Sequence, residues 1–242
     1  MTEQLLNTVA PQNKRRKKKH MNFSDKKTKK SKPDKKEKTD DLTSLIFLDA
    51  PKEPPKVRMI SLFGNLGEDE TAEIAQSLLV LKEYGKEEIY ENPEDPDSPI
   101  KEIQYKPIDF YISTWGGDAR GMFAIYDTMR MVRECCEIKT HGLGKVMSAG
   151  VLLLAAGTKG SRKIGKNCRV MLHSIRGDQW GPLHNLENEM EEMRWIQEQH
   201  IDALVQETDI TKKHLKKLLD RKVNVYLDAK EAVEYGIADI IV

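Results

Sequence analysis

The most informative stretch of the chain reads Gly144-Lys-Val-Met-Ser148-Ala-Gly150 and runs directly into the apolar segment Val151-Leu-Leu-Leu-Ala-Ala156. The apolar segment predicts a buried helix, and Ser148 lies where that helix begins. Glycines on both sides allow the backbone to turn sharply and to approach a bound molecule closely. The start of a helix also offers unpaired N–H groups and a positive dipole end, which favour a negatively charged intermediate. Ser148 is therefore a candidate nucleophile, and its simpler alternative is an N-cap serine on a core helix.

Strand and helix patterns alternate on both sides of this stretch, which predicts α/β layers around a parallel sheet. We expect strands at 58–63, 108–112, 137–140, 162–164, 169–172 and 223–226, and helices at 71–84, 120–133, 183–208, 211–221 and 229–235. Active sites of such sheets lie at the carboxyl ends of the strands. The loops at Gly116-Gly117, at 142–148 and at His173 all follow predicted strands, so they are expected to converge.

Charge is distributed unevenly along the 242 residues, whose net charge is +1. Residues 1–40 hold 14 Lys/Arg and 5 Asp/Glu, with almost no apolar side chains among the lysines. We therefore expect residues 1–56 to be a disordered basic tail and linker, and residues 57–242 to be the folded domain. The tail is expected either to stay solvated or to bind nucleic acid or an acidic partner without specificity. Residues 85–106 are acidic and proline-rich, and predict an exposed insertion containing a hairpin.

The cysteines indicate a reducing compartment. Cys135, Cys136 and Cys168 are odd in number and two are adjacent, so they do not predict a disulfide framework. No Cys/His spacing of the zinc kind is present, so no metal site is expected. No segment is apolar enough to span a bilayer or to act as a signal peptide. These features together predict a cytoplasmic protein without membrane contact.

A serine nucleophile needs a histidine base, and the base needs an acceptor that orients it. His173 is the best candidate, because it ends an apolar strand and precedes the glycine-rich loop Ser174–Gly181. His141, before Gly142, is expected to be a core residue or a pocket wall. The histidines of the later helices are most simply surface residues: His184, His200 and His214.

Several segments together resemble the proteolytic subunit of caseinolytic (Clp) protease, in that family's order and near its spacing. They are Gly116-Gly117 with Ile125-Tyr-Asp-Thr-Met129, Ser148-Ala-Gly150 with Leu153-Leu-Ala-Ala-Gly157, Arg169-Val-Met-Leu-His173, and Glu231-Ala-Val-Glu-Tyr-Gly236. The resemblance covers about Arg58 to Val242, apart from the insertion at 85–106. Each motif alone is a weak signal, and their combination makes the resemblance specific.

The resemblance implies a ClpP/crotonase-like α/β fold of repeated β-β-α units with a long protruding handle helix. It also implies homo-oligomeric or mixed rings of seven subunits, stacked through that helix around a chamber. An AAA+ unfoldase would feed peptide substrates into the chamber and use the ATP, so no cofactor is expected in this chain.

Carried over residue by residue, the resemblance gives roles to the candidate residues. Ser148 matches the nucleophile and His173 the base, while the N–H groups of Gly117 and Ala149 match the oxyanion donors. Substrate is expected to lie as an added strand along the loop that begins with Ser174, Ile175 and Arg176, a mode in which main-chain hydrogen bonds tolerate varied sequences.

The chain departs from the family pattern at the third triad position, where the family's aspartate falls on Asn224. An amide oxygen can hold a histidine Nδ1–H, but it supplies no charge to stabilise the imidazolium. The analogous Asp→Asn change in a serine protease costs about 10⁴ in kcat. Asp220 and Asp228 are the nearest substitutes. Trp115 and Ile175 also depart, since the family usually has a small residue or proline before Gly-Gly and proline after the histidine.

The leading interpretation is a Clp-type serine endopeptidase subunit that hydrolyses unfolded proteins through an acyl-enzyme, with a Ser148/His173/Asn224 triad. Asn224 favours one alternative, a weakly active or inactive structural ring subunit. A viral head-maturation protease of the same fold is a further alternative, in which the basic tail would contact nucleic acid or scaffold. An acyl-CoA enzyme of the crotonase type ranks last, because it does not need the Ser148/His173 pair.

Overall fold

The computed structural model describes residues 57–95, 97–178, 180–220 and 223–242. The prediction of a disordered tail at 1–56 lies outside the described residues. The described part is built around a mixed, mostly parallel sheet whose strand order is β1-β4-β5-β6-β9. The strands are β1 (Met59–Leu66), β4 (Ile108–Gly117), β5 (Ile138–Met147), β6 (Lys163–Ile164) and β9 (Ile240–Ile241), all parallel to their neighbours. This architecture confirms the α/β fold class that the sequence predicted.

Two further strands extend the sheet beside the end of β5. Strand β7 (Arg169–Leu172) runs parallel to Lys145–Met147, and β8 (Val225–Leu227) pairs antiparallel with β7. The strand predicted at 137–140 is thus too short, because β5 continues through its glycines to Met147. Gly144 has φ 65, a conformation that suits glycine and lets the strand change partners without ending.

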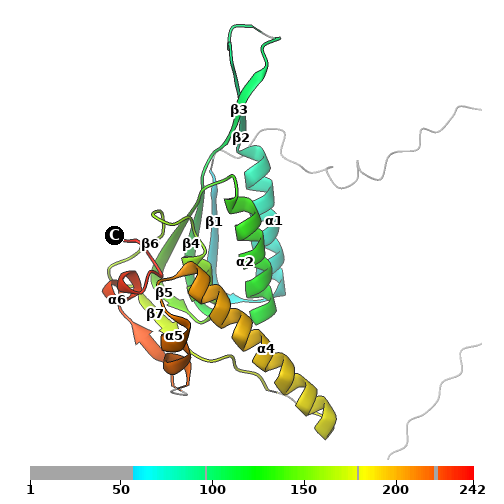
Figure 1. Ribbon diagram of the computed structural model, residues 1–242, viewed down its shortest axis with the longest axis vertical. Coiled ribbons are helices and arrows are strands. Elements are labelled where there is room, and N and C mark those ends of the chain that lie inside the picture. The colour runs from blue at the N-terminus through cyan, green and yellow to red at the C-terminus, as the bar shows by residue number, and fades with distance from the viewer. Residues whose placement is uncertain (1–56, 96, 179, 221–222) are drawn as a thin grey trace, which may run out of the picture. The chain divides into compact units, whose positions relative to one another are not determined.

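Helices cover the sheet and fill its core. Helices α1 (Glu68–Tyr84) and α2 (Ala119–Arg133) lie side by side against the strands (Figure 1). Helix α2 turns a stripe of buried side chains inward, with Met122, Ile125, Met129 and Val132 at helical spacing. Helix α3 (Ala149–Ala155) is apolar on all sides and wholly buried, as its sequence requires.

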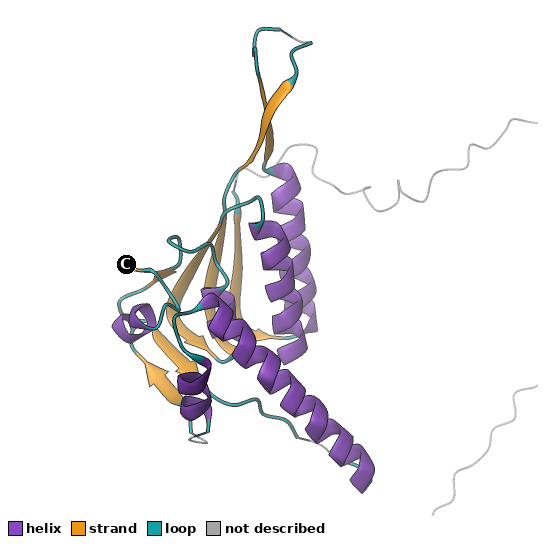
Figure 2. Ribbon diagram, viewed as in Figure 1, coloured by secondary structure: helices purple, strands orange, loops and turns teal. Residues whose placement is uncertain are grey.

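The remaining helices follow β7. Helix α4 (Leu183–Glu207) is the longest, and its first half extends away from the sheet while its last turns rejoin the body (Figure 2). Helices α5 (Lys212–Leu219) and α6 (Ala229–Glu234) flank β8. No helix among the described residues is both long and apolar enough to cross a membrane.

Strands β2 (Lys86–Tyr90) and β3 (Ile100–Tyr105) pair antiparallel as an exposed hairpin. The hairpin projects beyond the end of α1 (Figure 1). It contains the two short segments from which the sequence predicted a hairpin, Ile89-Tyr90 and Ile103-Gln-Tyr105.

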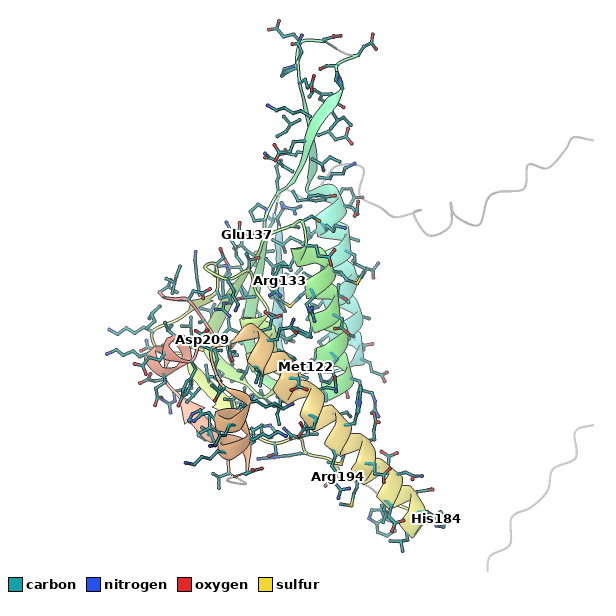
Figure 3. The ribbon with its side chains drawn as sticks, in the orientation of Figure 1. Met122, Arg133, Glu137, His184, Arg194 and Asp209 are labelled. Atoms are coloured by element: carbon teal, nitrogen blue, oxygen red, sulfur yellow. The ribbon has the colours of Figure 1, made fainter. Side chains whose placement is uncertain are left out.

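A buried ion pair fixes the inner end of α4. Glu207, only 2 % exposed, accepts two hydrogen bonds from the Arg133 guanidinium, each at 2.8 Å. Tyr126 adds a third, donated from its hydroxyl at 3.0 Å. Burial, reinforced by the Glu207 charge, raises the pKa of Tyr126 to about 12. Figure 3 labels Arg133 on α2 and Asp209 just beyond α4, where the long helix returns to the body.

Candidate active site

Ser148 occupies the junction between β5 and α3 in a strained conformation. Its φ of 55° and ψ of −119° make it the one non-glycine residue with positive φ in the described part of the chain. Its N–H donates to the carbonyl oxygen of Met171 at 2.8 Å, so β7 holds the turn from the side. Residues in sparsely populated backbone regions cost stability and cluster at functional sites. The partly exposed serine therefore lies on a turn that the surrounding fold enforces.

The two glycines that end β4 lie beside Ser148. Gly116 has φ 96, and a Cβ placed on it would stand 2.6 Å from the Ser148 Cβ and 3.0 Å from Oγ. Gly117 has φ 153, and its Cβ would collide with the Leu66 backbone. Neither position has room for a side chain. The structure thus brings together the Gly116-Gly117 end of β4 and the serine turn, two of the three loops that were expected to converge.

The two predicted oxyanion donors, Gly117 and Ala149, border this junction. Ala149 is the first residue of α3, and Gly117 is the last residue of β4. The neighbouring N–H of Gly116 donates to Thr114 Oγ1 at 2.9 Å, so it is already used within the fold. The donor roles of Gly117 and Ala149 stay predictions.

His173 directly follows β7, and its ring is held by the next residue in the chain. Nδ1 lies 2.5 Å from the carbonyl oxygen of Ser174. Because a carbonyl oxygen can only accept, Nδ1 must carry the hydrogen, and Nε2 is left with its lone pair. Burial lowers the pKa of His173, the Ser174 carbonyl opposes that effect, and the nearby Arg176 charge adds to it. The ring is consequently neutral at pH 7. It is in the tautomer whose Nε2 lone pair can accept a proton, as a general base requires.

Asn224 is not hydrogen-bonded to His173. Its Oδ1 accepts a hydrogen bond from Arg176 Nη2 at 2.7 Å. A guanidinium donor makes a stronger hydrogen bond than a neutral one, which explains why the amide oxygen turns to Arg176. The hydrogen bond expected between Asn224 and the imidazole is therefore absent from this arrangement, and the catalytic role of Asn224 stays a prediction.

The two carboxylates considered as substitutes also lie elsewhere. Asp228 caps α6 by accepting from the N–H groups of Lys230 and Glu231, at 2.8 and 2.9 Å. Asp220 is the residue at which α5 ends. Neither forms a hydrogen bond with His173 among the described residues.

The segment after His173 is attached at three points. The Ser174 hydroxyl donates to the Leu219 carbonyl at 3.0 Å, the Ile175 N–H donates to Gln197 Oε1 at 2.7 Å, and Arg176 is held by Asn224. The Ile175 N–H is therefore not available to a substrate strand in this arrangement. The predicted substrate-binding roles of Ser174, Ile175 and Arg176 otherwise remain untested predictions.

His200 is the residue near the site that sequence reasoning misplaced. The prediction of a surface histidine is wrong, because His200 is 3 % exposed. Burial, with the nearby His173 as a second cause, lowers its pKa to about 4, so the ring is neutral at pH 7. A signal was present: Ile196, His200 and Leu204 recur every four residues, and the other two are buried.

The described residues hold no group of three or more His, Cys, Asp or Glu side chains arranged to bind a metal ion. The chemistry predicted for the site is that of a serine, a neutral imidazole and backbone N–H groups. This combination suits acyl transfer.

Comparison with known proteins defines the family. The sequence model of the Clp protease family matches residues 100–242. The ATP-dependent Clp protease proteolytic subunit 1 of Bifidobacterium longum (strain NCC 2705) is 31 % identical over 203 residues, which cover 84 % of this chain and 74 % of that protein. The ATP-dependent Clp protease proteolytic subunit 4 of Rhodococcus jostii (strain RHA1) is 36 % identical over 135 residues, or 56 % of this chain and 68 % of that protein. The chain belongs to the Clp protease family, as its motifs predicted.

Proposed function

We propose that this chain is the proteolytic subunit of an ATP-dependent Clp-type serine endopeptidase that hydrolyses peptide bonds of unfolded proteins. Family membership supports the reaction class. The observation that carries the proposal is the enforced conformation of Ser148, whose Cβ and Oγ face the bare backbone of Gly116. A core-helix cap needs neither positive φ nor a side-chain-free neighbour, whereas an exposed nucleophile is served by both.

The proposed reaction begins when Ser148 Oγ attacks the carbonyl carbon of the scissile peptide bond. His173 Nε2 takes the hydroxyl proton and then gives it to the departing amine, leaving an ester on Ser148. Water attacks the ester, His173 takes its proton, and the carboxylic acid leaves as the proton returns to Ser148. The N–H groups of Gly117 and Ala149 stabilise the oxyanion of both tetrahedral intermediates.

Asn224 is proposed as the orienting residue at the third triad position. To act there, its Oδ1 has to exchange Arg176 for the Nδ1–H of His173. A neutral amide stabilises the imidazolium less than a carboxylate does, so we also propose that activity is lower than that of a Ser-His-Asp enzyme. A ring subunit of reduced activity is the second candidate, and the Arg176–Asn224 hydrogen bond is the observation that favours it.

The active assembly is proposed to be a homo-oligomeric or mixed heptameric ring fed by an AAA+ unfoldase, which uses the ATP named in both relatives. Apolar side chains that remain exposed on α4 support stacking of rings through that helix: Leu183, Met190 and Trp195. The excess of lysine and arginine in residues 1–40 supports weak binding of nucleic acid or another polyanion. The affinity of this binding should fall steeply as the salt concentration rises.

Hydrolysis of a fluorogenic peptide by the assembled protein tests the proposal. The parent should turn over the peptide, whereas Ser148→Ala and His173→Ala should not, although both should form the same assemblies by light scattering. Equal turnover by Ser148→Ala and the parent would place the chemistry elsewhere.

A further inference from the structure

Trp115 is an exposed aromatic residue next to the serine turn. It precedes Gly116 on β4, and a Cβ on Gly116 would stand 3.0 Å from Ser148 Oγ. Trp115, which is 61 % exposed, and Gly117 are both open to solvent, while Gly116 is buried between them. Alternate residues of a strand share a face, so the indole lies on the side of β4 that carries Gly117. It therefore borders the place where Gly117 is proposed to hold a peptide carbonyl.

Lys145 places its ammonium over this indole. Its Nζ lies 4.9 Å from the centroid of the Trp115 ring, within the distance of about 6 Å at which a cation is attracted to an aromatic face. Lys145 belongs to the part of β5 that leads directly into Ser148. The contact restricts a long side chain that otherwise samples many rotamers. The ammonium is thus held in position at the rim of the candidate site.

No carboxylate pairs with this ammonium. Within the described residues Lys145 takes part in none of the ion pairs. The acidic residue that follows the two glycines, Asp118, caps α2 by accepting the N–H of Gly121. The charge of Lys145 is therefore free to meet an anionic group that arrives from solution.

Arg169 adds a second positive charge beside the first. It is the residue of β7 in register with Lys145, and like charges on neighbouring strands repel each other. Hydrogen bonds from the start of α6 lower the pKa of Asp228, and the Arg169 charge adds to this effect, but no ion pair joins these two residues in the described part of the chain. An anion bound between the strands would relieve the repulsion.

We propose that Lys145, held by Trp115, is a specificity-determining residue that binds an acidic side chain of the substrate close to the scissile bond. A glutamate or aspartate carboxylate accepts a charge-assisted hydrogen bond from the ammonium. A lysine at the same position of the peptide is repelled by Lys145 and Arg169. The inference rests on the proposed serine peptidase function and names its substrate class, which is peptides with an acidic residue beside the cleaved bond.

Peptide hydrolysis by the assembled full chain tests the inference. The fluorogenic peptides differ only in carrying glutamate, glutamine or lysine at successive positions around one cleavage site. At one position glutamate should raise kcat/KM about three- to tenfold over glutamine, as a partly exposed charge pair does. The preference should shrink as the salt concentration rises. Lys145→Gln should remove the preference for glutamate, and Lys145→Glu should reverse it in favour of lysine.

Two further sets of variants separate charge recognition from a general loss of folding. Lys139→Gln is the matched control, because Lys139 lies on the same strand, is paired with Glu137 at 3.8 Å and should leave the preference unchanged. Trp115→Ala releases the ammonium and should weaken the preference, whereas Trp115→Phe keeps an aromatic face and should retain most of it.

Binding to the Ser148→Ala variant separates the inference from the proposed function. This variant is not expected to cleave, so fluorescence anisotropy of the labelled peptides measures recognition alone. The glutamate peptide should bind about three- to tenfold more tightly than the glutamine peptide, and adding Lys145→Gln should equalise the two. Equal affinities in Ser148→Ala, or a preference that survives Lys145→Gln, would overturn the inference. A parent that hydrolyses no peptide while Ser148→Ala still prefers glutamate would reject the proposed function and leave the acidic specificity in place.

Discussion

Gly116 lies against Ser148 with no space for a side chain between them: a Cβ on Gly116 would stand 2.6 Å from the Ser148 Cβ. The end of β4 and the start of α3, more than 30 positions apart in the chain, therefore fit as one unit. The serine is held from the other side by its hydrogen bond to Met171. This double restraint keeps an unfavourable backbone conformation in place at a partly exposed residue.

Gly116→Ala should abolish activity, because the new methyl group displaces Ser148. The positive φ of residue 116 also strains an alanine there by about 1–3 kcal/mol. Gly160→Ala is the matched control. Gly160 has φ 89 but open space around its Cβ, so this variant should lose stability and keep kcat. Urea unfolding and peptide hydrolysis measure both effects. Full activity in Gly116→Ala would show that the two residues are not coupled.

The pH dependence of kcat/KM should report His173. Burial holds its pKa below the ordinary 6.5, and only the neutral ring is a base. Activity should therefore be lost as pH falls through that pKa, with a half-point below pH 6.5. Arg176→Gln removes a charge that lowers the pKa, so the half-point should move to higher pH. Arg194→Gln, on the neighbouring helix, should not move it. A half-point above 6.5 in the parent would contradict the site geometry.

Asn224→Asp should not by itself raise kcat, because the new carboxylate forms an ion pair with Arg176 and stays away from His173. Removing the competitor as well, in the double variant Asn224→Asp with Arg176→Ala, should raise kcat by tenfold or more, within the roughly 10⁴ that separates Asp from Asn in a triad. Steady-state kinetics of the two single variants and the double variant decide the question. A gain in Asn224→Asp alone would mean that Arg176 does not retain residue 224.

Glu207→Ala should destabilise the body by about 3–5 kcal/mol, because it leaves the partly buried Arg133 charge without its carboxylate partner. Among the described residues, only the carbonyl oxygens of Ala156 and Gly157 would still accept from that guanidinium. The midpoint of urea unfolding should fall at an unchanged m-value. Arg120→Ala removes the exposed pair with Glu192 and should leave the midpoint where it was. Equal midpoints for the two variants would show that the buried pair does not fix the end of α4.

Local patterns were sufficient to predict the layers and the serine turn. The alternation of Ile108, Phe110 and Ile112 indicated β4, and the apolar run after Ser148 indicated α3. Comparable local signals were misread in β5, whose glycines were taken for a loop, and in α4, where His200 was placed on the surface. Both errors have the same cause. The residue type, glycine or histidine, was given more weight than the position of that residue in the surrounding pattern of buried side chains.

The partners of the site residues could not be predicted from local patterns. Arg176 and Asn224 are 48 positions apart, and Ile175 and Gln197 are 22 apart. Which acceptor faces a given donor depends on how α4, α5 and β8 pack around the His173 segment. The motif therefore predicts Asn224 at the triad position, while the fold determines that its oxygen accepts from a guanidinium.

Covalent labelling of Ser148 by a fluorophosphonate tests the central claim most directly. The reagent phosphonylates a serine only where a base and oxyanion donors activate it. Mass spectrometry of the digested protein should find the adduct on Ser148, lost in Ser148→Ala and strongly slowed in His173→Ala. An adduct on another residue, or an unlabelled Ser148 in a fully assembled protein, would contradict the account.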